Sequence, residues 1–142
     1  MLQTYKKIAF VREPMELIVS AYQNKFAQDY EGRTYHHKYD KSIIMKYRKH
    51  FTGEVTDEHY TKFDEFVQYL IDRPPNKNRN EHWERQYKLE KPPEGLVTKA
   101  LMKTYFSMIS EEKFLRLRHA YDEDYEIFGL HKPTYLEVIG SV

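Results

Sequence analysis

The stretch from Ile8 to Phe26 constrains the fold more than any other part of the sequence, because two patterns meet in it. Residues 7–12 are predicted to form a strand, because the apolar run that ends at Val11 does not alternate with polar residues, which is typical of a strand covered on both faces. Pro14 then suits the first turn of a helix. Apolar residues three and four positions apart predict that this helix buries one stripe, formed by Met15, Ile18, Val19, Tyr22 and Phe26.

Helical spacing of apolar residues recurs along the rest of the chain. It predicts further helices over residues 39–50, 61–73, 96–108 and 110–128. The predicted inward side chains are Tyr39, Ile43, Tyr47, Phe63, Phe66, Val67, Leu70, Val97, Leu101, Tyr105, Met108, Phe114, Leu117, Tyr121 and Phe128. The balance is therefore helical, and the single convincing strand needs partners to be stable.

Local signals mark the ends of these predicted helices. Thr61 with Asp64 resembles a capping box, and Pro74 closes the helix that follows. Ser110 can cap the last predicted helix, because its hydroxyl can accept a hydrogen bond from a backbone N–H of the first turn. Gly129 is the natural end of that helix.

Composition bounds the class of protein. The 142 residues fit a single domain, residues 1–142, and 23 Lys and Arg against 22 Asp and Glu leave a net charge of +1. Total charge therefore does not favour nucleic acid or an anionic membrane as a partner. The chain has no cysteine, which excludes thiolate metal sites and a cysteine nucleophile. It also carries no apolar run long enough for a membrane span and no targeting segment, so we expect it to be soluble as written.

Arg12 and Ser20 are candidate anion-binding residues. Open α/β sheets bind ligands at the carboxyl ends of their strands, and the planar guanidinium of arginine suits phosphate. Ser20, six residues past Pro14, lies about 9 Å along the helix axis. Helical side chains lean toward the N-terminus, so a tetrahedral anion could touch both residues. The alternative is that Arg12 pairs with Glu13 or Glu16 while Ser20 faces solvent, and spacing alone does not exclude it.

Other polar clusters give weaker signals. The histidines at positions 36, 37, 50 and 59 share no spacing that fixes a metal site, so no metal is expected. The basic runs at residues 46–50 and 116–119 could meet an anionic glycan, or they could be solvated helix faces. Both runs are interleaved with acidic or apolar residues, which favours the second interpretation.

The segment FVREPMELIVSAYQNKF, residues 10–26, resembles the 3′-phosphate-binding segment of the Golgi carbohydrate sulfotransferases. That group includes the chondroitin, dermatan, N-acetylgalactosamine 4-O- and HNK-1 enzymes. Four further segments resemble the same family in the same order, so the likeness runs from about residue 7 to residue 136. They are IIMKYRKH at 43–50, FDEFVQYLID at 63–72, NEHWERQYKL at 80–89 and DEDYEIFGLHKPTYL at 122–136.

The resemblance implies a P-loop-like α/β fold and a sulfuryl transfer in the Golgi lumen. The donor would be 3′-phosphoadenosine 5′-phosphosulfate, and the acceptor would be a hydroxyl of a glycan. Arg12 and Ser20 would hold the 3′-phosphate of this donor. The whole implied donor-binding stretch is Arg12, Glu13, Pro14, Met15, Glu16, Leu17, Ile18, Val19 and Ser20.

His82 and Trp83 are the candidates for catalysis and for binding of the acceptor. An imidazole can accept a proton from a sugar hydroxyl, and an indole can stack on a sugar face. Glu81 and Glu84 could orient the histidine. The alternative is that Trp83 anchors its loop to the core while His82 caps that loop.

The sequence also departs from the family pattern. Leu17 stands where the family has a second arginine, and Glu90 and Pro93 stand where it has paired cysteines. Only six residues precede Lys7, too few for the strand and loop that hold the 5′-phosphosulfate, which argues against catalysis by the chain as written. A sheet strand expected after Gly95 is missing too.

We therefore interpret the chain as a truncated or engineered partial sulfotransferase-like domain that is mostly helical with few strands. The alternative function is a non-catalytic helical interaction module derived from that fold. Lost strands would leave apolar surface uncovered, so a homo-oligomer is also a candidate assembly.

Overall fold

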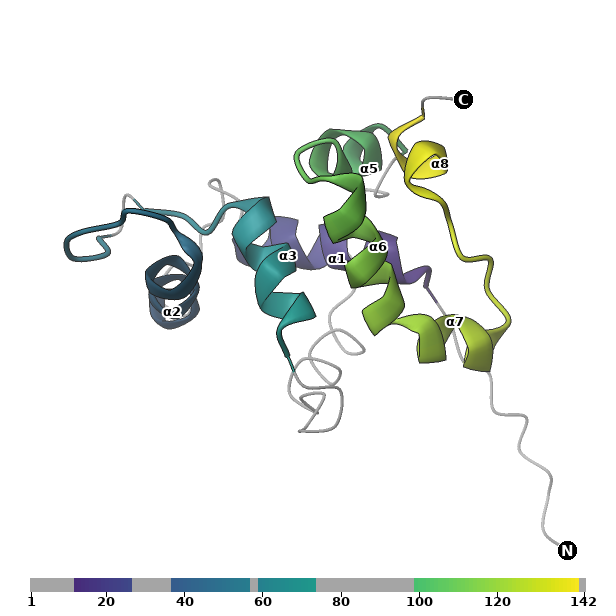
Figure 1. Ribbon diagram of the computed structural model, residues 1–142, viewed down its shortest axis with the longest axis horizontal. Helices are drawn as coiled ribbons and strands as arrows, with labels where there is room; N and C mark the ends of the chain where they lie inside the picture. Colours follow the sequence, from purple (N-terminus) through teal and green to yellow (C-terminus); the bar gives the residue numbers. More distant parts are fainter. Residues whose placement is uncertain (1–11, 27–36, 57–58, 74–98, 141–142) are drawn as a thin grey trace, which may run out of the picture.

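The computed structural model describes residues 12–26, 37–56, 59–73 and 99–140, and the regular structure in these ranges is helical. In Figure 1, α3 lies between α2 and α6, α1 passes behind α3 and α6, and α5 lies beside α8. The helices are α1 (Pro14–Lys25), α2 (His37–Tyr47), α3 (Phe63–Ile71), α5 (Lys99–Phe106), α6 (Glu111–Ala120), α7 (Asp122–Phe128) and α8 (Tyr135–Ile139).

The helical part of the predicted fold class is confirmed for the described residues, which contain no strand. The predicted strand lies outside these ranges except for Arg12, and residues 74–98 lie outside them as well. The P-loop-like α/β arrangement therefore stays a prediction. Within the same ranges, no helix is long and apolar enough to cross a membrane.

Helix α1 forms as its sequence predicts. Pro14 occupies the first turn, and the carboxylate of Glu13 accepts a hydrogen bond from the backbone N–H of Glu16 at 2.8 Å. This bond satisfies one of the N–H groups that a helix start leaves without an intrahelical partner. The predicted stripe is confirmed, since all its members are buried: Met15, Ile18, Val19, Tyr22 and Phe26.

A series of contacts between aromatic rings joins α1 to the C-terminal half of the molecule. The ring of Tyr22 meets that of Phe63 edge to face, with centroids 5.2 Å apart. Phe106 makes the same kind of contact with Phe63 at 5.4 Å and with Phe114 at 5.3 Å. Such pairs contribute beyond the area they bury, because the positive edge of one ring faces the negative face of the next. The core is thus continuous from α1 through α3 and α5 to α6.

A buried polar link ties α1 to α2 and to the start of α3. The hydroxyl of Tyr22 donates to the backbone carbonyl of Thr61 at 2.9 Å. The backbone N–H of Thr61 donates to Oδ1 of Asp40 at 3.1 Å, and the threonine hydroxyl donates to the same oxygen. Because Thr61 is fully buried, these bonds replace the water that its polar groups lose on folding.

The predicted capping box of Thr61 with Asp64 is wrong by one residue. The N-cap of α3 is Lys62, and its backbone N–H donates to Oε2 of Glu65 at 2.8 Å. The threonine hydroxyl is held by Asp40, so it is taken by a tertiary contact instead of a cap. A side chain from α2 has overridden the local signal.

The side chain of Arg48 is turned into the protein. Its Nε lies 2.8 Å from Oε1 of Glu65 and its Nη2 lies 2.9 Å from Oε2, a two-bond ion pair. Nη2 also donates to the carbonyl of Tyr60 at 2.5 Å. The two charged side chains are only 18% and 7% exposed. The interpretation of residues 46–50 as a solvated face is therefore wrong for Arg48, which fastens α2 to α3.

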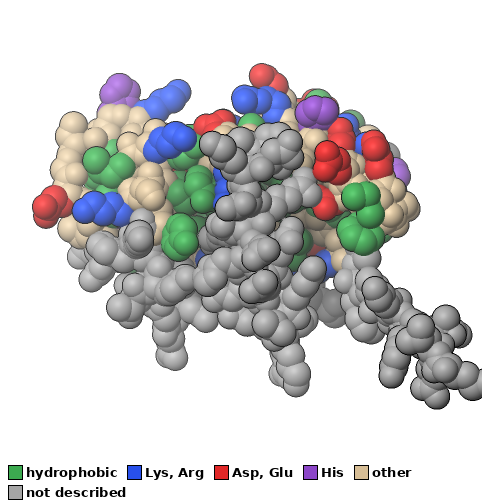
Figure 2. All heavy atoms as spheres, turned by 90° about the horizontal axis from the view of Figure 1, so that it is seen from below, with side chains coloured by type: hydrophobic (Ala, Val, Ile, Leu, Met, Phe, Trp, Pro, Cys, Tyr) green, Lys and Arg blue, Asp and Glu red, His purple; other side chains and the backbone are tan. Residues whose placement is uncertain are grey.

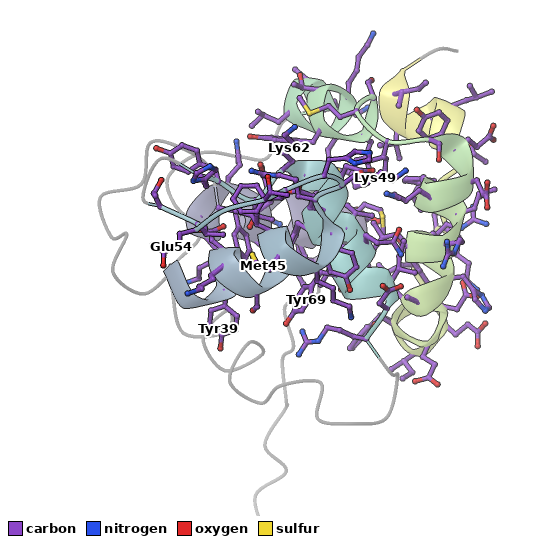
Figure 3. All side chains as sticks on the ribbon, turned by 60° about the vertical axis from the view of Figure 1, so that its left-hand side comes forward. Tyr39, Met45, Lys49, Glu54, Lys62 and Tyr69 are labelled. Atoms are coloured by element: carbon purple, nitrogen blue, oxygen red, sulfur yellow. The ribbon has the colours of Figure 1, made fainter. Side chains whose placement is uncertain are left out.

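The face of α2 follows the predicted pattern. Ile43 is buried, and Tyr39 and Tyr47 are half-buried against the core. The helix ends at Tyr47, a turn before the predicted end near His50. Met45 lies on the outer side of α2, which Figure 3 brings forward, and it is 56% exposed.

The predicted caps in the C-terminal half are confirmed. The backbone N–H of Lys113 donates to Oγ of Ser110 at 3.2 Å. Gly129 has a φ of 61°, a left-handed conformation that ends α7. The first turn of α7 is acidic, which stabilises a helix start through the helix dipole. In Figure 2, acidic side chains gather on the right, toward the side where α7 lies in Figure 1.

The single helix predicted over residues 110–128 is divided at Tyr121, whose N–H bonds to the carbonyl three residues earlier. This break rotates the segment that follows it. The prediction that Phe128 faces inward is wrong, because its side chain is 48% exposed, whereas Tyr125 is only 1% exposed. Periodicity carried across a break assigns the wrong face.

A similar shift affects the helix predicted over residues 96–108. Leu101 and Tyr105 are half-buried, but Met108 is 59% exposed and lies beyond the end of α5. The fully inward side chains of α5 are instead those of Met102 and Phe106. Val97 lies outside the described residues.

Replacing Arg48 by Met should lower the free energy of unfolding by about 3 kcal/mol, because it leaves the buried Glu65 carboxylate without its cation. Lys113→Met is the matched control. Its partner Asp64 is 51% exposed, so this change should cost about 0.5 kcal/mol. Urea unfolding of both variants measures the difference, and equal losses would contradict the structural role of Arg48.

Stability should fall in alkaline solution as Tyr22 ionises. Burial, together with the nearby Tyr105, Asp40 and Glu65, raises the pKa of Tyr22 from 10 to about 12, although Arg48 opposes the shift. The folded state therefore holds this proton more tightly than the unfolded state. Its stabilising effect is fully present below pH 10 and is lost as the pH rises through about 12.

The test is urea unfolding at a series of pH values from about 9 to about 12, a range that covers both the ordinary and the shifted pKa of Tyr22. The Tyr22→Phe variant should be less stable than the intact chain at neutral pH, because it loses the bond to the Thr61 carbonyl. Its stability should then decline less steeply with pH. Parallel declines in the two proteins would contradict the assignment.

Candidate anion-binding site

Glu16 and Ser20 lie on the same face of α1, because they are four residues apart in the helix. The side chain of Arg12, two residues before the helix begins, contacts both, so the three residues form one row along the side of α1. Nη1 of Arg12 lies 3.4 Å from Oγ of Ser20 and donates to it. Nε of Arg12 lies 3.5 Å from Oε2 of Glu16. The arginine side chain is 31% exposed, whereas Ser20 as a whole is buried. The structure thus brings the two candidate residues together, and binding of an anion by them stays a prediction.

The alternative interpretation of Arg12 is correct in one part. Arg12 does pair with Glu16, but Ser20 does not face solvent. The Glu16 side chain is 43% exposed, and an ion pair this exposed contributes little to stability. A phosphate that accepts hydrogen bonds from the guanidinium and the serine hydroxyl would therefore displace this carboxylate at small cost.

The rest of the predicted donor-binding stretch supports the row from inside the molecule. The side chains at four of its positions are buried in the core, and they are Pro14, Met15, Ile18 and Val19. Leu17, which stands where the family pattern has an arginine, is half-buried. Contact between these side chains and a ligand would require the helix to leave its packing. By packing in the interior, these buried side chains fix the orientation of α1.

The carboxylate of Glu13 bonds to α1 and to α7 instead of pairing with its neighbour Arg12. Its Oε2 caps the backbone N–H of Glu16, and its Oε1 accepts a hydrogen bond from the hydroxyl of Tyr125 in α7. Burial and this bond raise the pKa of Tyr125 well above its ordinary value, so the hydroxyl keeps its proton and remains a donor. Both oxygens of Glu13 are therefore engaged away from Arg12.

Sequence reasoning did not find Tyr125. The predicted helix over residues 110–128 placed Tyr121 and Phe128 inward. Tyr121 does pack against the core, but the break there makes Tyr125 the buried side chain in place of Phe128. The available signal was weak. The hydroxyl of a buried tyrosine usually finds a hydrogen-bond partner, but the sequence does not say which partner.

The other predicted site residues are not placed by the structure. His82, Trp83, Glu81 and Glu84 lie outside the described residues, and so do the positions of the missing cysteine pair. Among the described residues, no group of three histidine, aspartate or glutamate side chains could hold a metal ion. His59 is held by Thr56, whose hydroxyl oxygen lies 2.9 Å from Nδ1.

Comparison with known proteins identifies the family. A family model described as the sulfotransferase family matches residues 1–94, about two-thirds of the chain. The chain belongs to the sulfotransferase family. The family resemblance found in the sequence is therefore confirmed, and the curated relatives that match the chain are named as carbohydrate sulfotransferases.

Three of these relatives show the extent of the likeness. Carbohydrate sulfotransferase 11 of Rattus norvegicus is 45% identical over 94 residues, which is 64% of this chain and 26% of the relative. Carbohydrate sulfotransferase 14 of Homo sapiens is 42% identical over 91 residues, 64% of this chain and 23% of the relative. Carbohydrate sulfotransferase 8 of Mus musculus is 36% identical over 121 residues, 84% of this chain and 28% of the relative.

The matches cover only part of each relative and include several subtypes. The chain spans about a quarter of the length of the curated relatives it matches. Relatives with four different numbers match, namely 8, 9, 11 and 14, so the comparison shows the family and not one subtype. No solved structure matches the chain.

Replacing Arg12 by Met should change the free energy of unfolding by less than about 1 kcal/mol, because the partly exposed pair with Glu16 contributes little to folding. Urea unfolding of the variant beside the intact chain measures this. A loss several times larger would mean that Arg12 is a structural residue like Arg48, and that the row on α1 is not a free site.

Proposed function

We propose that this chain forms the part of a carbohydrate sulfotransferase that binds the 3′-phosphate of the sulfuryl donor. The donor is 3′-phosphoadenosine 5′-phosphosulfate, and the whole protein transfers its sulfuryl group to a hydroxyl of a glycan. The observation that carries the proposal is the contact between Arg12 and Ser20 on α1. The names of the relatives support the glycan as the acceptor class.

The row on α1 suits a phosphate because its two donors are already close together. The guanidinium supplies charge-assisted hydrogen bonds, and the serine hydroxyl supplies a neutral one. The N-terminal end of the helix adds a favourable electrostatic contribution for a negative charge nearby. Since the core fixes α1 through Met15 and Val19, little order has to be gained when the ligand binds.

The proposal assigns the remaining steps to residues outside the described ranges. The sugar oxygen attacks sulfur in line, the bond between sulfur and the 5′-phosphate oxygen breaks, and His82 accepts the proton of the sugar hydroxyl. Trp83 stacks on the acceptor sugar. We place this reaction in the Golgi lumen, without a metal ion and without nucleic acid as a partner, and we include a homo-oligomer as a possible assembly.

The second candidate function is a non-catalytic helical interaction module. It is favoured by the core of the described residues, in which α1 packs on α5 and α3 packs on α2 and α6 without the help of a strand. Such a module would fold but would not respond to the nucleotide. The same titration therefore separates the two candidates.

Adenosine 3′,5′-bisphosphate should raise the melting temperature of the intact chain. At a concentration about 100 times its Kd, a ligand of the folded state stabilises it by about 2.7 kcal/mol. Adenosine 5′-monophosphate, which lacks the 3′-phosphate, should bind more weakly. Thermal unfolding with each nucleotide, followed by isothermal titration calorimetry, measures both effects.

Three variants locate the binding. Arg12→Met should weaken bisphosphate binding more than about tenfold, and Ser20→Ala should weaken it about fivefold, as expected for a charged and a neutral donor. Arg116→Met removes an exposed arginine on α6 and is the matched control, with no expected effect. A folded chain that shows no response to the bisphosphate would reject the proposal in favour of the helical module.

A further inference from the structure

Tyr125 connects the C-terminal half of the chain to the start of α1. Its hydroxyl donates to Oε1 of Glu13, a residue 112 positions earlier. Figure 1 shows the N-terminal end of α1 running toward α7, where this tyrosine lies. One side chain thus joins α7 to the N-cap residue of α1.

Tyr125 is itself firmly held. Its side chain is only 1% exposed, and its carbonyl accepts the N–H of Leu130 at 2.9 Å where Gly129 ends the helix. The neighbouring Arg118 of α6 donates to the carbonyl of Pro133 at 2.9 Å, which holds the segment after α7 in place. A hydroxyl on such a support can fix the position of whatever it binds.

Glu13 needs to be held because of where it stands. It directly follows Arg12, and a carboxylate next to a guanidinium competes with any anion for the same N–H donors. In the structure, one oxygen of Glu13 binds the N–H of Glu16 and the other binds Tyr125, so neither is directed to Arg12. Of the two carboxylates near Arg12, only the half-exposed Glu16 remains to be displaced.

We propose that Tyr125 is a positioning residue for the anion site on α1. By holding the carboxylate of Glu13 on the helix cap, its hydroxyl keeps the guanidinium of Arg12 available to the 3′-phosphate of the donor. This role rests on the proposed function, because it concerns the binding of that same phosphate. It adds a residue from the far end of the chain to a site that otherwise lies entirely within α1 and the residue pair before it.

The proposal makes a specific statement about Glu13. Removing the hydroxyl in Tyr125→Phe frees a charged carboxylate beside Arg12 and should weaken the binding of adenosine 3′,5′-bisphosphate about fivefold. Adenosine 5′-monophosphate has no 3′-phosphate that Arg12 could bind, so its affinity should not change. In a Glu13→Gln background the competing charge is absent, and Tyr125→Phe should then have no further effect.

Calorimetry on the intact chain, the two single variants and the double variant measures these affinities. Tyr135→Phe is the matched control, because the Tyr135 hydroxyl also donates a tertiary hydrogen bond, to the backbone carbonyl of Ile109 at 2.9 Å, but it lies on α8 away from Glu13. The control should lose stability without losing discrimination between the two nucleotides. Equal weakening by Tyr125→Phe and Tyr135→Phe would show a general structural effect and would overturn the proposal.

Hydrogen exchange without nucleotide provides the second readout. The amide of Glu16, which Glu13 caps, should exchange faster in Tyr125→Phe than in the intact chain. Unchanged exchange at this amide would overturn the positioning role even if the intact chain binds the bisphosphate. Failure of the intact chain to distinguish the two nucleotides would reject the proposed function and this role together, and it is recognised before any variant is made.

Discussion

The burial of Tyr22 is the interaction on which the arrangement of the described helices depends. Its ring contacts Phe63 of α3, and its hydroxyl bonds to the carbonyl of Thr61, so one residue fixes both the position of α1 and its rotation about its own axis. Because Ser20 lies two residues before Tyr22, that rotation also decides which way the candidate site faces. Packing energy and site geometry are therefore set by the same contact.

Arg48 and Arg12 show that the burial of its ion pair decides whether an arginine stabilises the fold or is available to a ligand. Arg48 forms a two-bond pair with Glu65 inside the α2–α3 junction, where losing the pair would leave a charge out of water. Arg12 has a longer contact with the more exposed Glu16, which solvent weakens and an anion can replace. The residue type is the same in both cases, and burial of the partner makes the difference.

Most predictions that depend on neighbouring residues were confirmed, although the cap predicted at Thr61 was not. The buried stripe of α1, the cap at Ser110 and the end at Gly129 follow from spacing and from backbone conformation within a few residues. The inward positions of Met108 and Phe128 were wrong, because each lies beyond the end or the break of a helix that the pattern treated as continuous. Periodicity carries no information about where a helix stops being regular.

The sequence by itself determined the family, from a match over residues 1–94, and the helix α1, from the spacing of apolar residues over a few turns. It also made Arg12 and Ser20 candidates for one site, and the structure then showed that their side chains meet. Only the tertiary structure decided that Asp40 would take the hydroxyl of Thr61 and that Tyr125 would hold Glu13. The physical reason is distance along the chain. A hydrogen bond between residues 112 positions apart forms because packing brings their helices together, and no local pattern encodes that meeting.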